Sequence, residues 1–198
     1  MKNYRKVDAR VLRINRHELA ARLASPEGTD PTDLSGLYEE LVRASSPAYV
    51  ATRVKLNKKN GTVEIGRALS HSSALCKLLS GSLECLAFVA TLGVGVDRLI
   101  LKRAQSSPYE SFVIDAMADA LVEALCDHAE AELTYGIECG SRFSPGYADI
   151  ELALGREIIT LTGADKLLGI RLTESGLMVP KKSVNALIPI SLDPYRGE

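Results

Sequence analysis

Apolar positions recur with a helical period in several parts of the chain. From residue 34 to 42 they are spaced i, i+3, i+4, i+7 and i+8, which predicts an amphipathic helix with Thr32 or Asp33 as its N-cap. A shorter pattern over residues 8–24 predicts one or two helical turns, and the longest pattern predicts a helix over 108–135. Three further helical segments are expected at 66–79, 96–104 and 150–162.

Other segments carry the composition of β-strands. Residues 48–56 are rich in β-branched side chains, and residues 62–65 follow Asn60-Gly61, a dipeptide that favours a tight hairpin turn. The short apolar run 83–92 predicts a buried strand. Two more short strands are expected at 167–172 and 186–191. Because there is no internal repeat or low-complexity linker, the chain is predicted to form one α+β domain over residues 1–198.

Composition and charge then narrow the function classes. Of 198 residues, 46% are hydrophobic and 25% charged, as in ordinary globular proteins. The net charge of -1 disfavours a nucleic-acid-binding module, which needs an excess of clustered Lys and Arg. No apolar run is long enough to span a membrane and the N-terminus has no signal-peptide core, so a cytoplasmic location is expected. The four cysteines are expected as buried or half-buried free thiols, with no metal site: Cys76, Cys85, Cys126 and Cys139.

Common catalytic and cofactor motifs are missing from the sequence. Neither a G-x-S-x-G elbow nor an H-E-x-x-H helix occurs, so no catalytic residue is predicted. Gly93-Val94-Gly95 follows a predicted strand, but Arg98 stands where a dinucleotide-binding loop needs its third glycine. These glycines therefore predict a tight strand-to-helix turn.

Carboxylates recur at every fourth residue along the predicted long helix. Asp115, Asp119, Glu123 and Asp127 span about 120° of its circumference, and Glu130 lies on the same side. One interpretation is a solvated helix face. The other is an acidic rim that faces a polar cofactor or a basic partner, and the spacing does not decide between them.

The segment Arg142-Phe143-Ser144-Pro145-Gly146-Tyr147 has the features of a stiff ligand-binding turn. Pro145 restricts its own backbone and that of Ser144, while Gly146 permits positive φ or close approach of a ligand. Tyr147 offers an aromatic face and Arg142 a planar cation for a carboxylate. A small zwitterionic ligand with an aromatic base would suit this turn, and an ordinary Pro-Gly turn is the alternative.

Four segments in order resemble one family, the activation domain of cobalamin-dependent methionine synthase. Residues 142–147 match its R-x-x-x-G-Y motif. The other three are Thr91-Leu92-Gly93-Val94-Gly95-Val96-Asp97 (T-L-G…V-D), Ala118-Asp119-Ala120-Leu121-Val122-Glu123 (A-D-x-L-x-E) and residues 170–184, which end in P-x-x-S-V. The resemblance covers roughly residues 90–190 and implies a mainly antiparallel sheet flanked by helices.

The resemblance also implies a function. The family domain binds S-adenosylmethionine and supports reductive methylation of cob(II)alamin, with an electron donor, on cobalamin-dependent methionine synthase. By the motif match, Arg142, Ser144, Gly146 and Tyr147 would contact S-adenosylmethionine, and Asp8 is a possible counterpart of an early family aspartate. The acidic pair of the A-D-x-L-x-E helix would face the corrinoid, which assigns that role to Asp119 and Glu123.

The chain also departs from the family pattern. Residues 148–151 read Ala-Asp-Ile-Glu where the enzyme's own domain has a Pro-Ala-Cys-Pro type stretch, and Val184 is not followed by the aromatic-rich segment of the full-length enzyme. At 198 residues the chain has no room for a corrinoid-binding or catalytic module, so a stand-alone reactivation subunit is expected. The alternatives are an S-adenosylmethionine-sensing or corrinoid-protein interaction module without methyl transfer, and an unrelated enzyme on the same fold.

Overall fold

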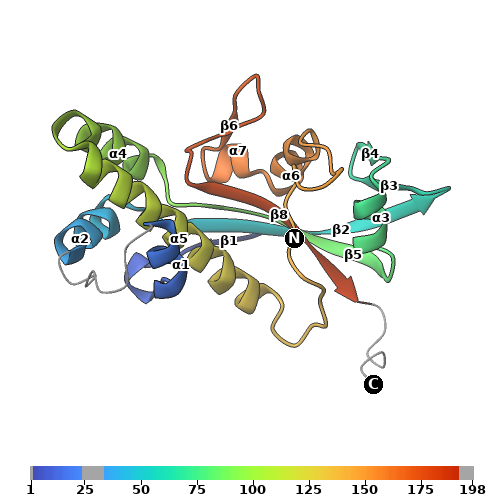
Figure 1. The fold of residues 1–198 in the computed structure, drawn as a ribbon. Helices are drawn as coiled ribbons and strands as arrows, with labels where there is room; N and C mark the ends of the chain where they lie inside the picture. The colour runs from blue at the N-terminus through green and yellow to red at the C-terminus, as the bar shows by residue number, and fades with distance from the viewer. Residues whose placement is uncertain (1, 24–33, 192–198) are drawn as a thin grey trace.

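The computed structural model describes residues 2–23 and 34–191, and its centre is an antiparallel sheet (Figure 1). The strand order is β4-β3-β2-β5-β8, with β1 paired to β2. The strands are β1 Asn3–Lys6, β2 Ala48–Lys59, β3 Thr62–Ile65, β4 Ala68–Ser70, β5 Ser82–Thr91 and β8 Ser183–Ser191. A separate two-stranded hairpin consists of β6 Arg171–Leu172 and β7 Met178–Val179.

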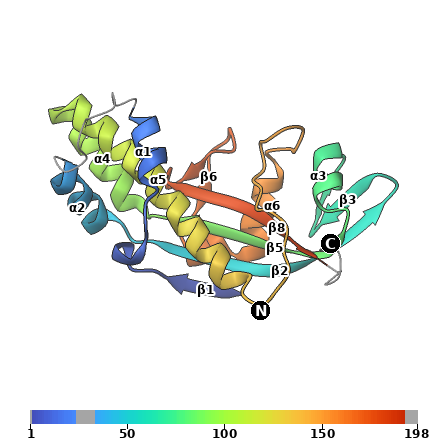
Figure 2. The same ribbon diagram turned by 60° about the horizontal axis from the view of Figure 1, so that its bottom comes forward.

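Helices cover both faces of the sheet (Figures 1 and 2). One face carries η1 Ala9–Val11, α1 Arg16–Arg22, α2 Ser35–Ala44, α4 Val94–Ser106 and the long α5 Pro108–Leu133. The other carries α3 Ser73–Leu78, α6 Leu154–Thr162 and α7 Ala164–Leu167. In Figure 1, α1, α2, α4 and α5 gather toward one end of the sheet, and α3 lies with the β3–β4 hairpin at the other.

The central strand β5 explains why residues 85–90 are all apolar. Successive side chains of a strand point to opposite faces. Leu86 and Phe88 enter the cluster beneath α5, while Ala87 and Val89 enter the cluster beneath α6. Because both faces are covered, neither set of positions can be polar.

The α+β class, the antiparallel sheet and the flanking helices are confirmed. Asn60-Gly61 forms the turn between β2 and β3, and Gly93, with φ of +83°, is the N-cap of α4. A Cβ at Gly95 would overlap the Ala44 carbonyl oxygen, so this glycine allows α4 to approach α2 closely. The two glycines therefore serve the predicted strand-to-helix turn and helix packing.

Other predictions of secondary structure were wrong in part. The helix expected over 66–79 begins only at Ser73, because Ala68–Ser70 pairs with β3 as strand β4. The strand expected over 167–172 is reduced to Arg171–Leu172, since α7 continues to Leu167. Strand β1 was missed because its polar sequence carries no hydrophobic alternation. The expected N-caps Thr32 and Asp33 lie outside the described residues.

Candidate functional site

The R-x-x-x-G-Y segment reaches its place by pairing with the outer edge of β8. Phe143 and Leu187 exchange backbone hydrogen bonds of 3.0 and 2.9 Å, and the Gly140 N–H donates to the Pro189 carbonyl. In such an extended pairing, neighbouring side chains point to opposite faces. Phe143 therefore packs toward the α6 side, and Arg142 extends toward α5.

Arg142 contacts the acidic row of α5, which consists of Asp115, Asp119, Glu123, Asp127 and Glu130. Its Nη2 donates to Glu123 Oε2 at 2.9 Å and to Asp127 Oδ1 at 3.3 Å, and its Nη1 lies 3.6 Å from Glu130 Oε2. The arginine side chain is 18% exposed, and its buried Nη1 has no hydrogen-bond acceptor within the part of the chain that the structure describes. One guanidinium thus faces three carboxylates, and its buried Nη1 lies near Glu130 without donating a hydrogen bond to it.

In the turn after Arg142, Gly146 adopts the positive φ that the sequence permits. Gly146 has φ of +93°, a value that L side chains rarely adopt, and its N–H donates to the Ile150 carbonyl at 3.0 Å. Pro145 is buried, whereas Tyr147 is 72% exposed. The backbone is therefore anchored while the aromatic side chain stays available to a ligand.

A cavity of about 300 Å³ opens between this turn and α5. Such a volume lies at the lower end of what small-molecule sites use. The cavity brings together three of the predicted contact residues, Arg142, Ser144 and Tyr147, and one residue predicted to face the corrinoid, Glu123. Phe143 and Val184 supply its apolar lining.

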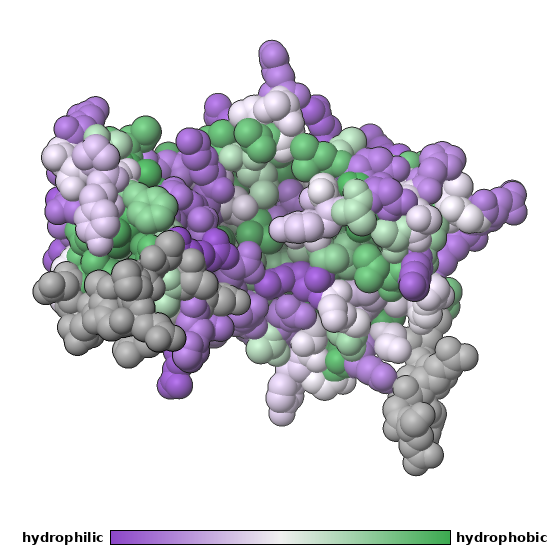
Figure 3. Space-filling model, in the orientation of Figure 1, coloured by the Kyte–Doolittle hydropathy of each residue, from purple (hydrophilic) through white to green (hydrophobic). Residues whose placement is uncertain are grey.

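The other end of the acidic row is bound by a lysine. Lys182 Nζ lies 2.6 Å from Asp119 Oδ1 and 2.9 Å from Asp115 Oδ1, and the lysine side chain is only 8% exposed. Arg22 adds a second cation 3.6 Å from Asp119 Oδ2. The row is thus neither a plain solvated face nor a free acidic rim: it forms ion pairs with Lys182 at one end and with Arg142 at the other. In Figure 3, hydrophilic side chains form a band over α5, bordered by more hydrophobic areas.

The P-x-x-S-V segment is held by the T-L-G…V-D segment. Asp97 Oδ2 accepts from the Lys181 N–H at 2.9 Å. The Ser183 hydroxyl donates to the Pro180 carbonyl and contacts Thr91 Oγ1 at 2.8 Å. These contacts place Val184 at the cavity. All four segments on which the resemblance rests therefore touch one another, directly or through α5.

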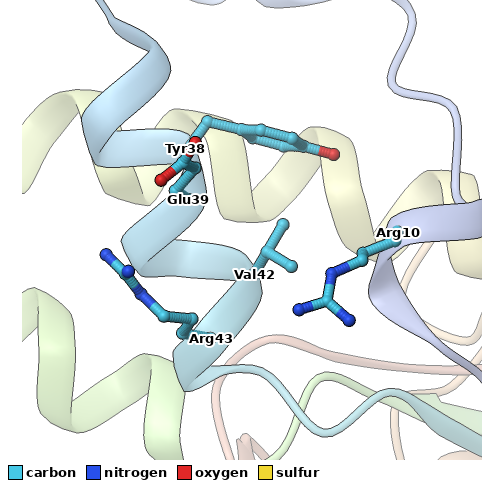
Figure 4. A pocket seen from close by; sticks show the side chains of 5 residues that line it. All are labelled: Arg10, Tyr38, Glu39, Val42 and Arg43. Carbon is cyan, nitrogen blue, oxygen red and sulfur yellow. The ribbon is translucent and has the colours of Figure 1, made fainter.

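Asp8 lies in a different environment. Its carboxylate accepts from the Arg10 N–H at 3.0 Å and caps η1, and Asp8 does not line the Arg142 cavity. Arg10 instead lines a second cavity of about 360 Å³ at α2 (Figure 4). In that view Arg10 extends toward Val42, whereas Arg43 leaves the helix on another side, so the two guanidinium groups do not converge.

Sequence reasoning missed Lys182 and Asp97 as partners of the site. Their only signal was a charged residue within a motif that otherwise looked structural.

The cysteines match their prediction as free thiols, and burial raises the pKa of Cys126, beneath Arg142, to about 12. Among residues 2–23 and 34–191, no group of His, Cys, Asp and Glu could hold a metal ion. None of the helices in these ranges is long and apolar enough to cross a membrane.

Comparison with known proteins agrees with this arrangement. The family model described as "Vitamin B12 dependent methionine synthase, activation domain" matches residues 70–192, more than half of the chain. The fold is similar to "Crystal Structure of the MetH Reactivation Domain bound to AdoHcy", with a TM-score of 0.75 and 19% identity over 98% of this chain and 79% of that one. No curated protein gave a significant match. The match over residues 70–192 includes all four motif segments, and the chain therefore belongs to the family of vitamin B12-dependent methionine synthase activation domains.

Proposed function

We propose that this chain binds S-adenosylmethionine in the Arg142 cavity and, as a separate subunit, supports reductive methylation of cob(II)alamin on a cobalamin-dependent methionine synthase. The observation that carries the proposal is that three of the four family segments line one cavity, while the fourth holds the chain beside Val184 through Asp97 and Thr91. A related fold described as bound to AdoHcy, the demethylated product of this ligand, adds support.

The cavity suits the parts of the ligand. Tyr147, largely exposed, provides an aromatic face for adenine, and the positive φ of Gly146 gives the turn the shape that sets Tyr147 at the cavity. Glu123 provides a carboxylate for the cationic sulfonium or ammonium group. Because the Arg142 side chain is already paired with three carboxylates and its Nη1 is buried, its role is to hold the turn against α5 rather than to meet a ligand carboxylate.

The chain itself contributes position rather than acid–base chemistry. The partner's corrinoid, once reduced by one electron from an external donor, supplies the nucleophile, and the methyl group leaves the sulfonium sulfur to give S-adenosylhomocysteine. No proton moves in this transfer, so no side chain need act as a general acid or base. Holding the methyl carbon toward the cobalt is a contribution of proximity and orientation.

Reactivation in trans tests the proposal. A methionine synthase that lacks its activation domain is inactivated to cob(II)alamin and mixed with reductant, S-adenosylmethionine and this chain. We expect methyl-transfer activity to return in proportion to the added chain. The same recovery rate with and without the chain would overturn the proposed function.

A binding module without methyl transfer is the second candidate, because the chain departs from the family pattern at residues 148–151. Calorimetry separates the two. Binding of S-adenosylmethionine without any reactivation would favour a sensor or corrinoid-protein escort. Absence of binding at millimolar ligand would disfavour both methyl transfer and sensing.

A further inference from the structure

The residues just after Tyr147 are anchored to the start of α3, on the face of the sheet opposite α5. The Asp149 carboxylate accepts from the Ser72 hydroxyl at 2.5 Å and from the Ser73 N–H and hydroxyl at 2.8 and 2.9 Å. It also accepts from the Ala74 N–H at 3.2 Å. These hydrogen bonds, the one from Ser72 first, lower the pKa of Asp149 to about 2, so the group is charged at any physiological pH.

Asp149 lies within residues 146–150, the part of the ligand turn (residues 142–150) that backbone hydrogen bonds close. The Gly146 N–H donates to the Ile150 carbonyl, and the Ile150 N–H donates back to the Tyr147 carbonyl, both at 3.0 Å. Ile150 is buried. Two hydrogen bonds join Ile150 to Gly146 and Tyr147. A movement of Asp149, the residue next to Ile150, would therefore displace the backbone of Gly146 and Tyr147.

The backbone of this turn also needs an external restraint. Ala148 has φ of +51°, one of two non-glycine residues with positive φ among those described. Such a conformation is unfavourable for an L residue and persists only when surrounding contacts hold it. The contacts of the adjacent Asp149 are well placed to do so.

A second carboxylate repeats the connection. Glu151 accepts from the Ser70 hydroxyl at 2.6 Å and more weakly from the His71 N–H at 3.4 Å. Both carboxylates therefore tie the segment after Tyr147 to residues 70–74, between β4 and α3. Residues 148–151 thus hold the turn through polar side-chain contacts to the end of β4 and the start of α3.

We infer that Asp149 is a positioning residue of the S-adenosylmethionine site: held by Ser72, Ser73 and Ala74, it fixes the backbone of Gly146 and Tyr147 in the conformation that receives the ligand. This inference rests on the proposed function. It states that the hydrogen bonds of Asp149, which lie outside the cavity, affect the affinity for S-adenosylmethionine.

The test compares Asp149→Ala with a matched control, Glu157→Gln. Glu157 on α6 likewise accepts a backbone N–H from a distant turn, that of Arg67 at 2.9 Å, but touches no residue of the ligand turn. We expect Asp149→Ala to weaken S-adenosylmethionine binding at least tenfold by calorimetry, and Glu157→Gln to leave it within twofold. Amide resonances of Gly146 and Tyr147 should shift in Asp149→Ala alone.

Milder variants keep the inference falsifiable if Asp149→Ala does not fold. Ser73→Ala removes one hydroxyl donor to Asp149 and should weaken binding by a smaller factor. Where Asp149→Ala does fold, adding Ser73→Ala to it should weaken binding no further, since the partner of Ser73 is already gone. If the wild type binds S-adenosylmethionine and Asp149→Ala, or Asp149→Asn in its place, binds it equally well, this inference alone is overturned. If the wild type does not bind, the proposed function is overturned as well.

Discussion

The two ends of the acidic row on α5 have the same sequence pattern and different structures. At the Lys182 end, one ammonium group that is 8% exposed is shared by Asp115 and Asp119. At the Arg142 end, one guanidinium faces three carboxylates, and the group borders a cavity. At the first end, the carboxylates are paired with a buried cation, and this ion pair links the start of β8 to α5. The second end carries more negative charge than Arg142 neutralises, and Glu123 of this end lines the cavity, which suits a cationic ligand.

The largest expected effect is a loss of stability when the ion pairs of Lys182 are removed. The double variant Asp115→Asn/Asp119→Asn leaves a buried ammonium group without a countercharge, and the free energy of unfolding should fall by about 3 kcal/mol. Urea denaturation measures the loss. Adding Lys182→Met should recover much of it, because removal of both signs of charge restores balance. A triple variant as unstable as the double one would show that charge balance is not what Lys182 provides.

The next effect concerns the cavity at the Arg142 end. Gly146→Val places a β-branched residue at φ of +93°, with its Cβ about 3.3 Å from Leu152 Cδ1, and should weaken S-adenosylmethionine binding about tenfold, or ~1.4 kcal/mol. Gly136→Val is the matched control, because Gly136 also has positive φ but has open space around its Cβ position. Equal binding by the two variants would show that the turn is not the ligand site.

A smaller effect separates the geometry of Arg142 from its charge. Arg142→Lys keeps one positive charge but cannot reach three carboxylates with a planar group, so we expect a loss of about 1 kcal/mol in stability and weaker ligand binding, by roughly threefold. Arg103→Lys is the comparison, since Arg103 also joins two carboxylates, Glu40 and Glu110, away from the cavity. Similar stability losses with unequal ligand affinities would set the Arg142 end apart as the functional one.

The smallest effect is a pH dependence outside the row. The pKa of Asp149 is lowered in the folded state, so its contribution to stability is fully present above the pKa of the unfolded chain and is lost as the pH falls toward about 2. The difference in unfolding free energy between wild type and Asp149→Asn should therefore be constant near neutral pH and shrink below pH 4. A difference that grows on acidification would contradict the assignment.

Local patterns in the sequence predicted much of the scaffold. The Asn60-Gly61 hairpin, the long helix after Pro108 and the buried run of β5 depend on interactions between near neighbours or on a single dominant periodicity. Strand β1 shows no hydrophobic alternation because its sequence is polar, and strands β6 and β7 have only two residues each, too few for a period to be visible.

For the candidate site, the sequence by itself determined the turn at residues 142–147 and the spacing of the carboxylates along one side of a helix. Only the tertiary structure decided how those charges are matched. Lys182 lies 63 residues from Asp119, and Ser72 lies 77 residues from Asp149. The strength of such a contact depends on distance and burial, and neither is encoded in the spacing of residues along the chain until β8 and α3 have packed beside their partners.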